Sequence, residues 1–395
     1  MKKTLLLGTF LNAASTLAPQ FMGMLVLASA EFGAFSAVYL AYALAIAVTM
    51  SVLADAWVIG SEEVRRGGWA VYSSVLVSVS VLFSFVGAGI AWLAWGQASV
   101  IFLSLFAVAL ANYRSGVRYV LVYEKRWNRT FVLDGIALLG TVAGFPLFTS
   151  LRMTGLEALT AAWAAGSLLG ALAWRLPHVS VPGAARWVKG NRRLIRPLLI
   201  DTVAMEATAI GTPFLLLPVL GLSGFGIYRS VANLSAPLRK LIAPVRPLLI
   251  AAPRRAMSAR FTAMILGCSA VVGIAAFAVL EVVAVQDWRL GVLGELTEFT
   301  LPVTIYLFSA LIVVYYSLMC RSLNRPKLLL SGRFFYTAVG VVGPLTGFIV
   351  GGISGAIWGF AIASLMSGIV WYLLACAALR GAHSTERSPG RTSQD

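Results

Sequence analysis

The chain of 395 residues is 59% apolar and only 12% charged, whereas soluble proteins are roughly 25% charged. Its mean hydropathy of +0.86 and its apolar stretches of more than about 18 residues exclude a soluble globular domain. The net charge of +16 would suggest nucleic-acid binding in a soluble chain. Here the positions of the basic residues indicate membrane topology instead, so no nucleic-acid partner is expected.

Twelve apolar segments follow one another along the chain, each long enough to cross about 30 Å of hydrocarbon as a helix. The predicted spans cover residues 4–28, 33–60, 69–95, 98–122, 130–150, 155–175, 197–221, 225–250, 261–284, 300–320, 328–350 and 354–379. The start of the first resembles a signal peptide, but its apolar run continues to Ala30, so we expect a retained span. The sequence therefore predicts an all-α, polytopic membrane protein with twelve transmembrane helices.

The basic residues distinguish the two sides of the membrane. With the N-terminus in the cytoplasm, 22 of the 31 Lys and Arg residues fall in the cytoplasmic connections and the C-terminal tail. The opposite side holds two, Arg152 and Arg289. Because cytoplasmic loops carry an excess of Lys and Arg, this partition predicts that both termini lie in the cytoplasm.

The longest internal connection separates the spans into two groups of six that show weak similarity to each other. A shift of 193 residues places Phe32-Gly33 on Phe225-Gly226 and brings span onto span. Duplicated halves of the same orientation are typical of transporters. We expect two pseudo-symmetric six-helix halves at 1–175 and 197–379, a basic cytoplasmic linker at 176–196 and a disordered tail at 380–395.

The linker mixes apolar and basic side chains. Trp187 and Val188 lie next to Arg186 and Lys189. An amphipathic helix on anionic lipid has this pattern. A solvated linker that is basic only because of its cytoplasmic position has it too. The sequence leaves both interpretations open.

Charged residues inside the spans mark the candidate binding site, since each charge at mid-bilayer costs at least about 2.5–3.5 kcal/mol. The candidate substrate-binding residues lie in spans four and eight: Arg114, Arg118, Arg229, Arg239, Lys240 and Arg246. Arg114 and Arg118 are four apart and share one helix face, as do Arg239 and Arg246 at a spacing of seven. Asp55 and Glu206 are candidate ion-coupling residues. Together these residues predict a net-cationic vestibule open to the cytoplasm.

Span eight is also unusual in its backbone. Pro237, Pro244 and Pro247 each remove a helical hydrogen bond, so this helix is predicted to be bent or broken. Irregular backbone at membrane depth is tolerated only where protein or a watery cavity covers it. Two other interpretations of the intramembrane arginines stay open. They could be structural ion-pair partners of acidic residues such as Asp134. Arg118 could also extend its side chain to the cytoplasmic interface.

Catalytic and metal-binding constellations are missing from the sequence. The two histidines, His178 and His383, lie outside the spans, and Cys268, Cys320 and Cys376 show no metal or disulfide spacing. No GxxxxGK[ST] loop is present to bind the phosphates of ATP. We therefore expect no enzyme activity, no metal site and no cofactor.

Two Phe-Gly pairs, Phe32-Gly33 and Phe225-Gly226, lie at the starts of spans two and eight, and the second begins the stretch FGIYRSVANL. With twelve spans in two halves and basic residues in spans four and eight, the chain resembles bacterial polysaccharide-biosynthesis flippases of the O-antigen type. These belong to the multidrug, oligosaccharidyl-lipid and polysaccharide exporter superfamily. In the lipid II flippase branch the first helix carries a basic residue, whereas spans one and seven of this chain carry none.

The resemblance implies alternating-access export of an undecaprenyl-diphosphate-linked oligosaccharide across the bacterial plasma membrane for cell-surface polysaccharide synthesis. The arginines of the candidate site are suited to a pyrophosphate headgroup, because a guanidinium can bind phosphate oxygens through bidentate hydrogen bonds. The implied partners are the lipid-linked saccharide, membrane lipids, and a glycan polymerase or glycosyltransferases. Two alternatives stay open: an ion-coupled multidrug exporter of the same superfamily, and a non-transport membrane scaffold of a glycan pathway.

Overall fold

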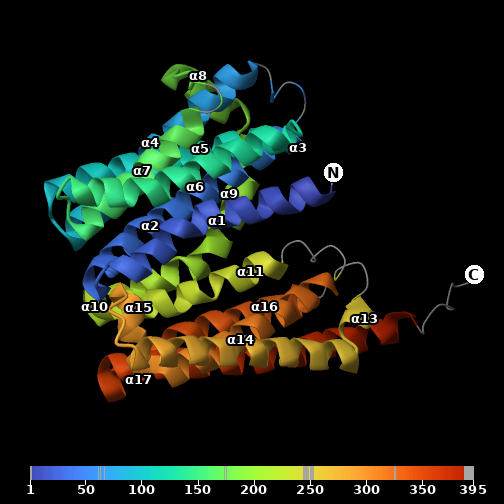
Figure 1. Cartoon of the computed structure of the whole chain (residues 1–395). Helices are drawn as coiled ribbons and strands as arrows, with labels where there is room; N and C mark the ends of the chain where they lie inside the picture. The colour runs from blue at the N-terminus through green and yellow to red at the C-terminus, as the bar shows by residue number, and fades with distance from the viewer. Residues whose placement is uncertain are drawn as a thin grey trace, which may run out of the picture. The chain divides into compact units, whose positions relative to one another are not determined.

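The computed structural model describes residues 2–60, 62, 64–65, 67–172, 174, 176–242, 249, 253–323 and 326–386. Every regular element in these ranges is a helix, which confirms the predicted all-α class (Figure 1). Within the same ranges, nine helical stretches are long and apolar enough to cross a membrane.

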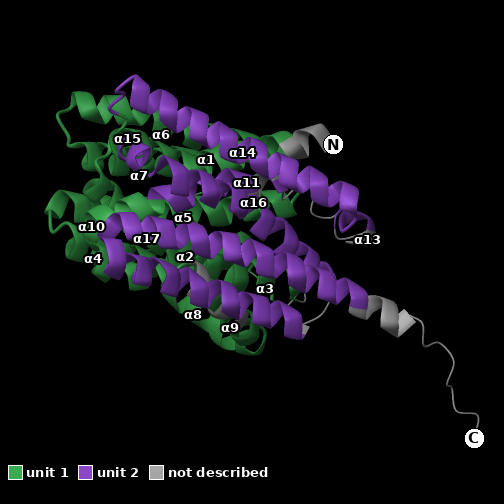
Figure 2. Ribbon diagram, turned by 90° about the horizontal axis from the view of Figure 1, so that it is seen from below, with its two compact units in different colours: residues 1–229, 290–292 green, residues 230–289, 293–395 purple. Residues whose placement is uncertain are grey.

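The chain forms two compact units, which are coloured separately in Figure 2. Unit 1 contains residues 1–229 together with the short segment 290–292, and unit 2 contains 230–289 and 293–395. The predicted division at 176–196 into two six-helix halves is a different partition of the chain, and it stays a prediction.

Unit 1 contains most of the helices of the N-terminal part of the chain. Its helices are α1 (Lys2–Val26), α2 (Ser29–Thr49), the π-helix η1 (Met50–Asp55), α3 (Ala56–Ile59), α4 (Gly68–Ala94), α5 (Ala98–Tyr123), α6 (Trp127–Ser150), α7 (Gly155–Leu172), α8 (Val181–Gly190), α9 (Arg192–Ala209) and α10 (Gly211–Leu234), whose last residues belong to unit 2. Among them, α2, η1 and α3 form one continuous stretch. The tightest pairing is that of α6 with α7, followed by α4 with α5 and α5 with α7. Predicted spans two to six each coincide with a helical stretch.

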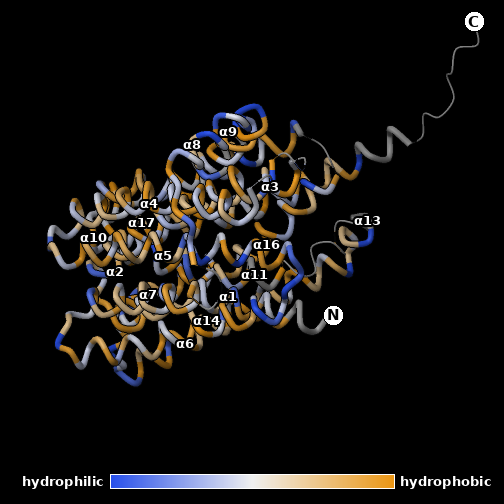
Figure 3. The backbone as a smooth tube through the Cα atoms, turned by 90° about the horizontal axis from the view of Figure 1, so that it is seen from above, coloured by the Kyte–Doolittle hydropathy of each residue, from blue (hydrophilic) through white to orange (hydrophobic). Residues whose placement is uncertain are grey.

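Unit 2 is built around a core of α14, α16 and α17. Its helices are α11 (Ala236–Ile242), α13 (Pro253–Ala256), α14 (Ala259–Val285), α15 (Gly291–Glu295), whose first two residues belong to unit 1, the 3-10 helix η2 (Leu296–Phe299), α16 (Thr300–Ser322) and α17 (Pro326–Glu386). The buried side chains between them include Tyr315, Tyr316 and Trp371. Hydrophobic residues run along the long helices of each unit, and hydrophilic residues gather around α8, α9 and α13 (Figure 3).

Helix α17 is a hairpin of two helices, which agrees with the two predicted spans 328–350 and 354–379. The backbone reverses at Gly351 and Gly352, and Gly352 has φ +60 and ψ −142, a conformation that favours glycine. The two arms then run side by side, since a Cβ atom on Gly347 would lie only 2.0 Å from the Gly355 carbonyl oxygen. The second arm is helical to Glu386, and residues 387–395 of the predicted tail lie outside the described ranges.

Spans seven and eight meet at a glycine break inside α10. Gly221 has φ +66 and ψ 175, so α10 consists of two helices joined at this residue. The predicted boundary between the spans, at residues 221–225, is therefore confirmed. Span eight is broken again at Ser235, two residues before Pro237, in agreement with the predicted interruption. Pro244 and Pro247 lie outside the described residues.

Part of the basic linker folds as helix α8 (Val181–Gly190). Helix α8 begins after Ser180, whose Oγ accepts a hydrogen bond from the Gly183 backbone N–H at 3.2 Å. Trp187 is 7% exposed, and its Nε1 donates to the Val64 carbonyl at 2.7 Å. Its ring lies 6.2 Å from that of Trp57. Protein therefore covers the tryptophan ring, and the position of α8 on anionic lipid stays a prediction.

Candidate functional site

Arg114 and Arg118 on α5 both contact one carboxylate, that of Asp134 on the neighbouring helix α6. The Arg118 Nε donates to Asp134 Oδ2 at 2.8 Å, and Arg114 Nη1 lies 3.8 Å from Asp134 Oδ1. The spacing of four places both arginines on one helix face, as expected from the sequence. The three residues form a cluster with two positive charges and one negative charge, which we call the Arg–Asp–Arg cluster.

The members of the Arg–Asp–Arg cluster differ in accessibility. The side chains of Asp134 and Arg114 are 0% and 4% exposed, whereas that of Arg118 is 23% exposed. Helix α7 covers Arg114, because a Cβ atom on Gly170 would lie 3.2 Å from Arg114 Cδ. Arg118 is therefore the member that a ligand can reach in this structure. Arg114, expected to line an open vestibule, is enclosed here beside Asp134.

The cluster is only partly satisfied by hydrogen bonds. Arg114 Nε, Arg114 Nη1 and Asp134 Oδ1 are buried and have no hydrogen-bond partner among the described residues. A buried charge pair is weakly stabilising unless its remaining donors and acceptors are bonded. An excess positive charge thus lies inside unit 1, held in place by helices α5, α6 and α7.

A second polar network lies close to the cluster on α5, and sequence reasoning missed it. Asn112 on α5 is fully buried and donates to Thr49 Oγ1 at 3.0 Å and to Ser80 Oγ at 2.9 Å. These bonds join α5 to α2 and α4. A mid-span asparagine two residues before Arg114 was the available signal, since polar side chains in membrane helices usually find partners on other helices.

The two candidate ion-coupling residues lie on elements that pack together in unit 1. Asp55 ends the π-helix η1, and its Oδ1 accepts a hydrogen bond from the Tyr119 hydroxyl at 3.2 Å. Glu206 is half-buried on α9, which packs against η1. Single π-helical turns are frequent at functional sites in proteins. Neither residue has an ion pair among the described residues, so their coupling role stays a prediction.

The remaining predicted site residues are described only in part. Arg229 lies on α10 and is half-buried. Arg239 and Lys240 fall on helix α11, but their side chains lie outside the described part of the chain, as does all of Arg246. The grouping of these residues with Arg114 and Arg118 in one site stays a prediction.

A cationic cluster that the sequence analysis did not single out lies at the turn between α5 and α6. The guanidinium carbons of Arg126 and Arg129 lie 4.9 and 4.3 Å from the ring centre of Trp174. Arg126 Nε also pairs with Glu124 Oε2 at 2.7 Å. The spacing of three between the arginines was a signal for a shared face, but nothing in the sequence indicated that Trp174 lies against it.

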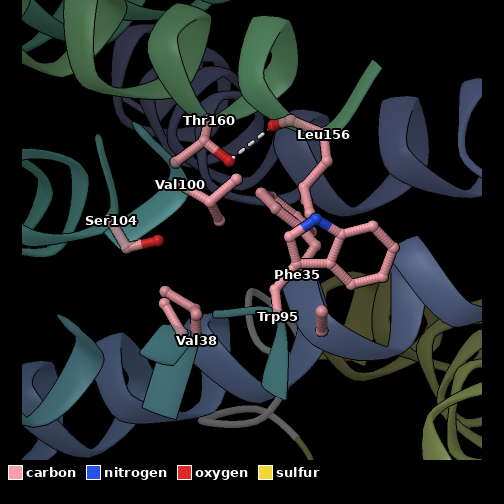
Figure 4. A pocket seen from close by; sticks show the side chains of 9 residues that line it. Phe35, Val38, Trp95, Val100, Ser104, Leu156 and Thr160 are labelled. Atoms are coloured by element: carbon pink, nitrogen blue, oxygen red, sulfur yellow. Dashed lines mark hydrogen bonds between the residues drawn. The ribbon is translucent and has the colours of Figure 1, made fainter. Parts of the chain in front are cut away.

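An apolar pocket elsewhere in unit 1 is a separate feature from the cationic cluster (Figure 4). Its cavity volume is only about 10 Å³, and it is lined mainly by apolar side chains, including Phe35 and Trp95. Its two polar side chains are Ser104 and Thr160, and the Thr160 hydroxyl donates to the Leu156 carbonyl at 2.7 Å. With no charged residue in its lining, this pocket is unsuited to an anionic headgroup.

Comparisons with known proteins identify the fold. No protein-family model matches the chain, and no curated protein sequence matches it either. Solved structures do match over nearly the whole length. An inward-facing multidrug resistance MATE family transporter of the MOP superfamily is 14% identical, with a TM-score of 0.64 and 96% of each chain covered.

Two further structures belong to the same group of folds. The lipid II flippase MurJ in an inward closed conformation is 12% identical, with a TM-score of 0.60, and 98% of this chain and 93% of that chain are covered. A MATE transporter in the straight conformation is 14% identical, with a TM-score of 0.56 and coverage of 96% and 95%. The protein thus has the fold of MOP-superfamily transporters and flippases, and it is a multi-pass membrane protein.

Proposed function

We propose that this protein is a flippase that moves an undecaprenyl-diphosphate-linked oligosaccharide across the bacterial plasma membrane by alternating access. The observation that carries the proposal is a partly exposed guanidinium, Arg118, held by a buried carboxylate inside a fold shared with transporters and a lipid II flippase. The cell-surface polysaccharide pathway it would serve follows from this substrate class.

The geometry of Arg118 suits a pyrophosphate. Its Nε is bonded to Asp134, which fixes the plane of the guanidinium and leaves the two Nη groups at its outer end for a ligand. Charge-assisted bidentate bonds from such a fork to phosphate are among the stronger hydrogen bonds in proteins. Because Asp134 also neighbours Arg114, the cluster keeps its positive charge when the ligand approaches.

The other parts of the mechanism are proposed by analogy between the two halves. Arg239, Lys240 and Arg246 would supply the cationic side of the site from span eight, while the lipid tail stays in the bilayer. Rocking of the halves would expose the site to each side in turn. Asp55 and Glu206 would bind the coupling proton or cation, and both termini would lie in the cytoplasm.

A multidrug exporter is the second candidate, because MATE transporters are among the structural neighbours. A cationic drug needs an uncompensated acidic side chain in the membrane. Asp134 does not meet this need, since two arginines share it. Asp55 and Glu206 are the residues that such a function would use.

Transport assays in proteoliposomes separate these functions. The probes are a fluorescent undecaprenyl-diphosphate-linked oligosaccharide and the cationic dye ethidium, each followed from the outside by quenching. We expect movement of the first probe, its loss in Arg118→Ala, and no loss in Arg186→Ala, which removes an exposed arginine of α8. Ethidium transport alone would support the drug exporter, and transport of neither probe would favour a scaffold.

A further inference from the structure

Two arginines and a tryptophan meet in unit 1 where the turn between α5 and α6 lies beside the end of α7. The guanidinium carbons of Arg126 and Arg129 lie 4.9 and 4.3 Å from the ring centre of Trp174. Both distances are those of cation–π contacts. We call these three residues the Trp174 cluster.

The backbone of the α5–α6 turn fixes the position of both arginines. Helix α5 ends in a Schellman motif, in which the Arg126 N–H donates to the Leu121 carbonyl at 2.8 Å. In the same motif the Lys125 N–H donates to the Val122 carbonyl at 3.0 Å. Lys125 has φ +56, a left-handed conformation that is uncommon for residues other than glycine. Arg129 follows three residues after Arg126, in the first turn of α6, so the two side chains leave the turn on the same side.

Close packing of α7 on α6 brings Trp174 to this turn. A Cβ atom on Gly166 would lie 2.5 Å from the Ala137 carbonyl oxygen, and one on Gly170 would lie 2.9 Å from the Leu133 carbonyl oxygen. The two helices therefore lie against each other up to the residues before Trp174. The Trp174 ring follows the last residue of α7 by two positions and packs against the hydrophobic core of unit 1. The indole is thus a fixed support for the two guanidinium groups.

The Trp174 cluster carries more positive charge than its neighbours balance. Arg126 Nε pairs with Glu124 Oε2 at 2.7 Å. Arg129 has no ion pair among the residues that the structure describes, and Lys125 adds an exposed positive charge beside it. Two guanidinium groups at one ring repel each other, and an anion that accepts hydrogen bonds from both relieves this repulsion. Phosphate suits this role, because its oxygens match the planar fork of a guanidinium.

The exposed side chains around the Trp174 cluster change from apolar to polar within a few residues. Leu169 and Leu172, on the last turns of α7, are 50% and 53% exposed, and Val132 on α6 is 49% exposed. Lys125 and Asn128, on the other side of the cluster, are exposed and polar. In a membrane protein such a transition marks the level of the lipid headgroups, where tryptophan is enriched. The transition places the two guanidinium groups at headgroup depth.

We infer that the Trp174 cluster is a binding site for an anionic phospholipid of the leaflet on the side of the basic loops. The lipid phosphate accepts hydrogen bonds from Arg126 and Arg129, while an acyl chain lies along Leu172. A zwitterionic lipid brings an ammonium group that the two arginines repel, so the site selects an anionic headgroup such as phosphatidylglycerol. The inference does not depend on the proposed transport function or on its substrate.

Native mass spectrometry of the full chain measures this selection. The protein is released in detergent and titrated with phosphatidylglycerol and, separately, with phosphatidylcholine. We expect the first phosphatidylglycerol to bind at least about tenfold more tightly than the first phosphatidylcholine. In R126A/R129A this preference should fall to less than about twofold.

A matched control removes the same net charge elsewhere. R255A/R260A replaces two exposed arginines of unit 2 and should keep the wild-type preference. An equal loss of preference in R255A/R260A and R126A/R129A would overturn the inference, because it would show that net charge alone attracts the lipid.

A charge-conserving variant separates a defined site from general attraction. R126K/R129K keeps both positive charges but loses the planar groups that stack on Trp174 and bind phosphate through two hydrogen bonds. We expect it to lose most of the preference for phosphatidylglycerol. A surface that is basic only because of its topology attracts anionic lipid by charge alone. Full preference in R126K/R129K would therefore overturn the inference.

Chemical modification of arginine distinguishes a lipid from free phosphate. Wild-type protein in nanodiscs is treated with phenylglyoxal, and each modified arginine is followed by peptide mass spectrometry. Adding phosphatidylglycerol to phosphatidylcholine nanodiscs should slow the modification of Arg129 about fivefold or more, as expected for an occupied site, and leave that of Arg255 unchanged. Inorganic phosphate added to nanodiscs of phosphatidylcholine alone should not protect Arg129. Equal protection by inorganic phosphate, or none by phosphatidylglycerol, would overturn the inference.

The lipid site and the proposed function fail in different experiments. If neither transport probe moves but wild type prefers phosphatidylglycerol and R126K/R129K does not, the proposed function fails and the lipid site stands. If the lipid-linked probe moves and wild type shows no preference for phosphatidylglycerol, the lipid site fails and the proposed function stands.

Discussion

At the scale of single residues, the Arg–Asp–Arg cluster is an ion-paired group of which one member is partly exposed. The sequence predicted arginines at depth in span four and offered two interpretations, a vestibule or an ion pair. In the structure both arginines pair with Asp134, with Arg114 enclosed and Arg118 partly accessible. The vestibule stays a prediction. One carboxylate therefore positions a guanidinium that a ligand can reach.

Removal of the shared carboxylate should destabilise the protein. In Asp134→Asn the buried guanidinium of Arg114 and the partly exposed one of Arg118 lose their counter-charge. Breaking a buried pair costs about 3–5 kcal/mol. We expect a lower melting temperature in detergent and lower expression. Adding Arg114→Gln should restore part of the stability, because it removes the less accessible of the uncompensated charges. A melting temperature equal to that of wild type would contradict a structural role for Asp134.

Transport should depend on the planar shape of the Arg118 guanidinium as well as on its charge. Arg118→Lys keeps the charge but loses the planar fork and the Nε bond to Asp134, so it should retain only part of the transport of the lipid-linked probe. Arg118→Ala should abolish transport while the protein stays folded. Partial transport by Arg118→Lys and none by Arg118→Ala, with unchanged melting temperatures, supports bidentate recognition. Full transport of the lipid-linked probe by a folded Arg118→Ala variant would contradict the proposed binding site.

At the scale of elements, helix α8 lies in the connection between predicted spans six and seven and packs as part of unit 1. Its Trp187 packs with Trp57 and bonds to the Val64 carbonyl, so the linker is attached to the ends of α3 and α4. Hydrophobic residues such as Val188, at 39% exposed, lie on the outer face. The linker therefore carries its basic side chains on a fixed support.

Truncation of the linker tryptophan should release α8. Trp187→Ala removes a buried ring, a change that typically costs about 3–5 kcal/mol, and most of this cost should fall on local docking. We expect faster cleavage between residues 176 and 196 by a protease in proteoliposomes. Trp187→Phe, which loses mainly the hydrogen bond, should have a smaller effect, and Val188→Ala none. Unchanged cleavage in Trp187→Ala would show that α8 is held by other contacts.

At the scale of the whole molecule, the basic residues predict the orientation of the helices. Cysteines at Lys189 on α8 and at Asp287 after α14, both exposed, test it in a chain without native cysteines. An impermeant maleimide added to intact cells should label D287C at once and K189C only after permeabilisation. Labelling of K189C in intact cells would show that the topology is the reverse of the predicted one.

The sequence by itself determined the helices and the class of protein. Apolar length and the placement of Lys and Arg are local properties, so spans two to six, the hairpin at Gly351-Gly352 and the break near Pro237 could be predicted without tertiary structure. The Phe-Gly pairs at Gly33 and Gly226 were also visible as a repeat.

Only the tertiary structure decided which surfaces meet. Membrane helices share similar apolar faces, so the sequence could not indicate that Asp134 joins both arginines, that Trp187 faces Trp57, or that Gly33 contacts Gly226. Such partners depend on the close approach of helices distant in sequence, which small residues permit and side-chain pairing completes. Position along the chain thus gave the order of the helices, whereas helix packing decided the partner of each residue.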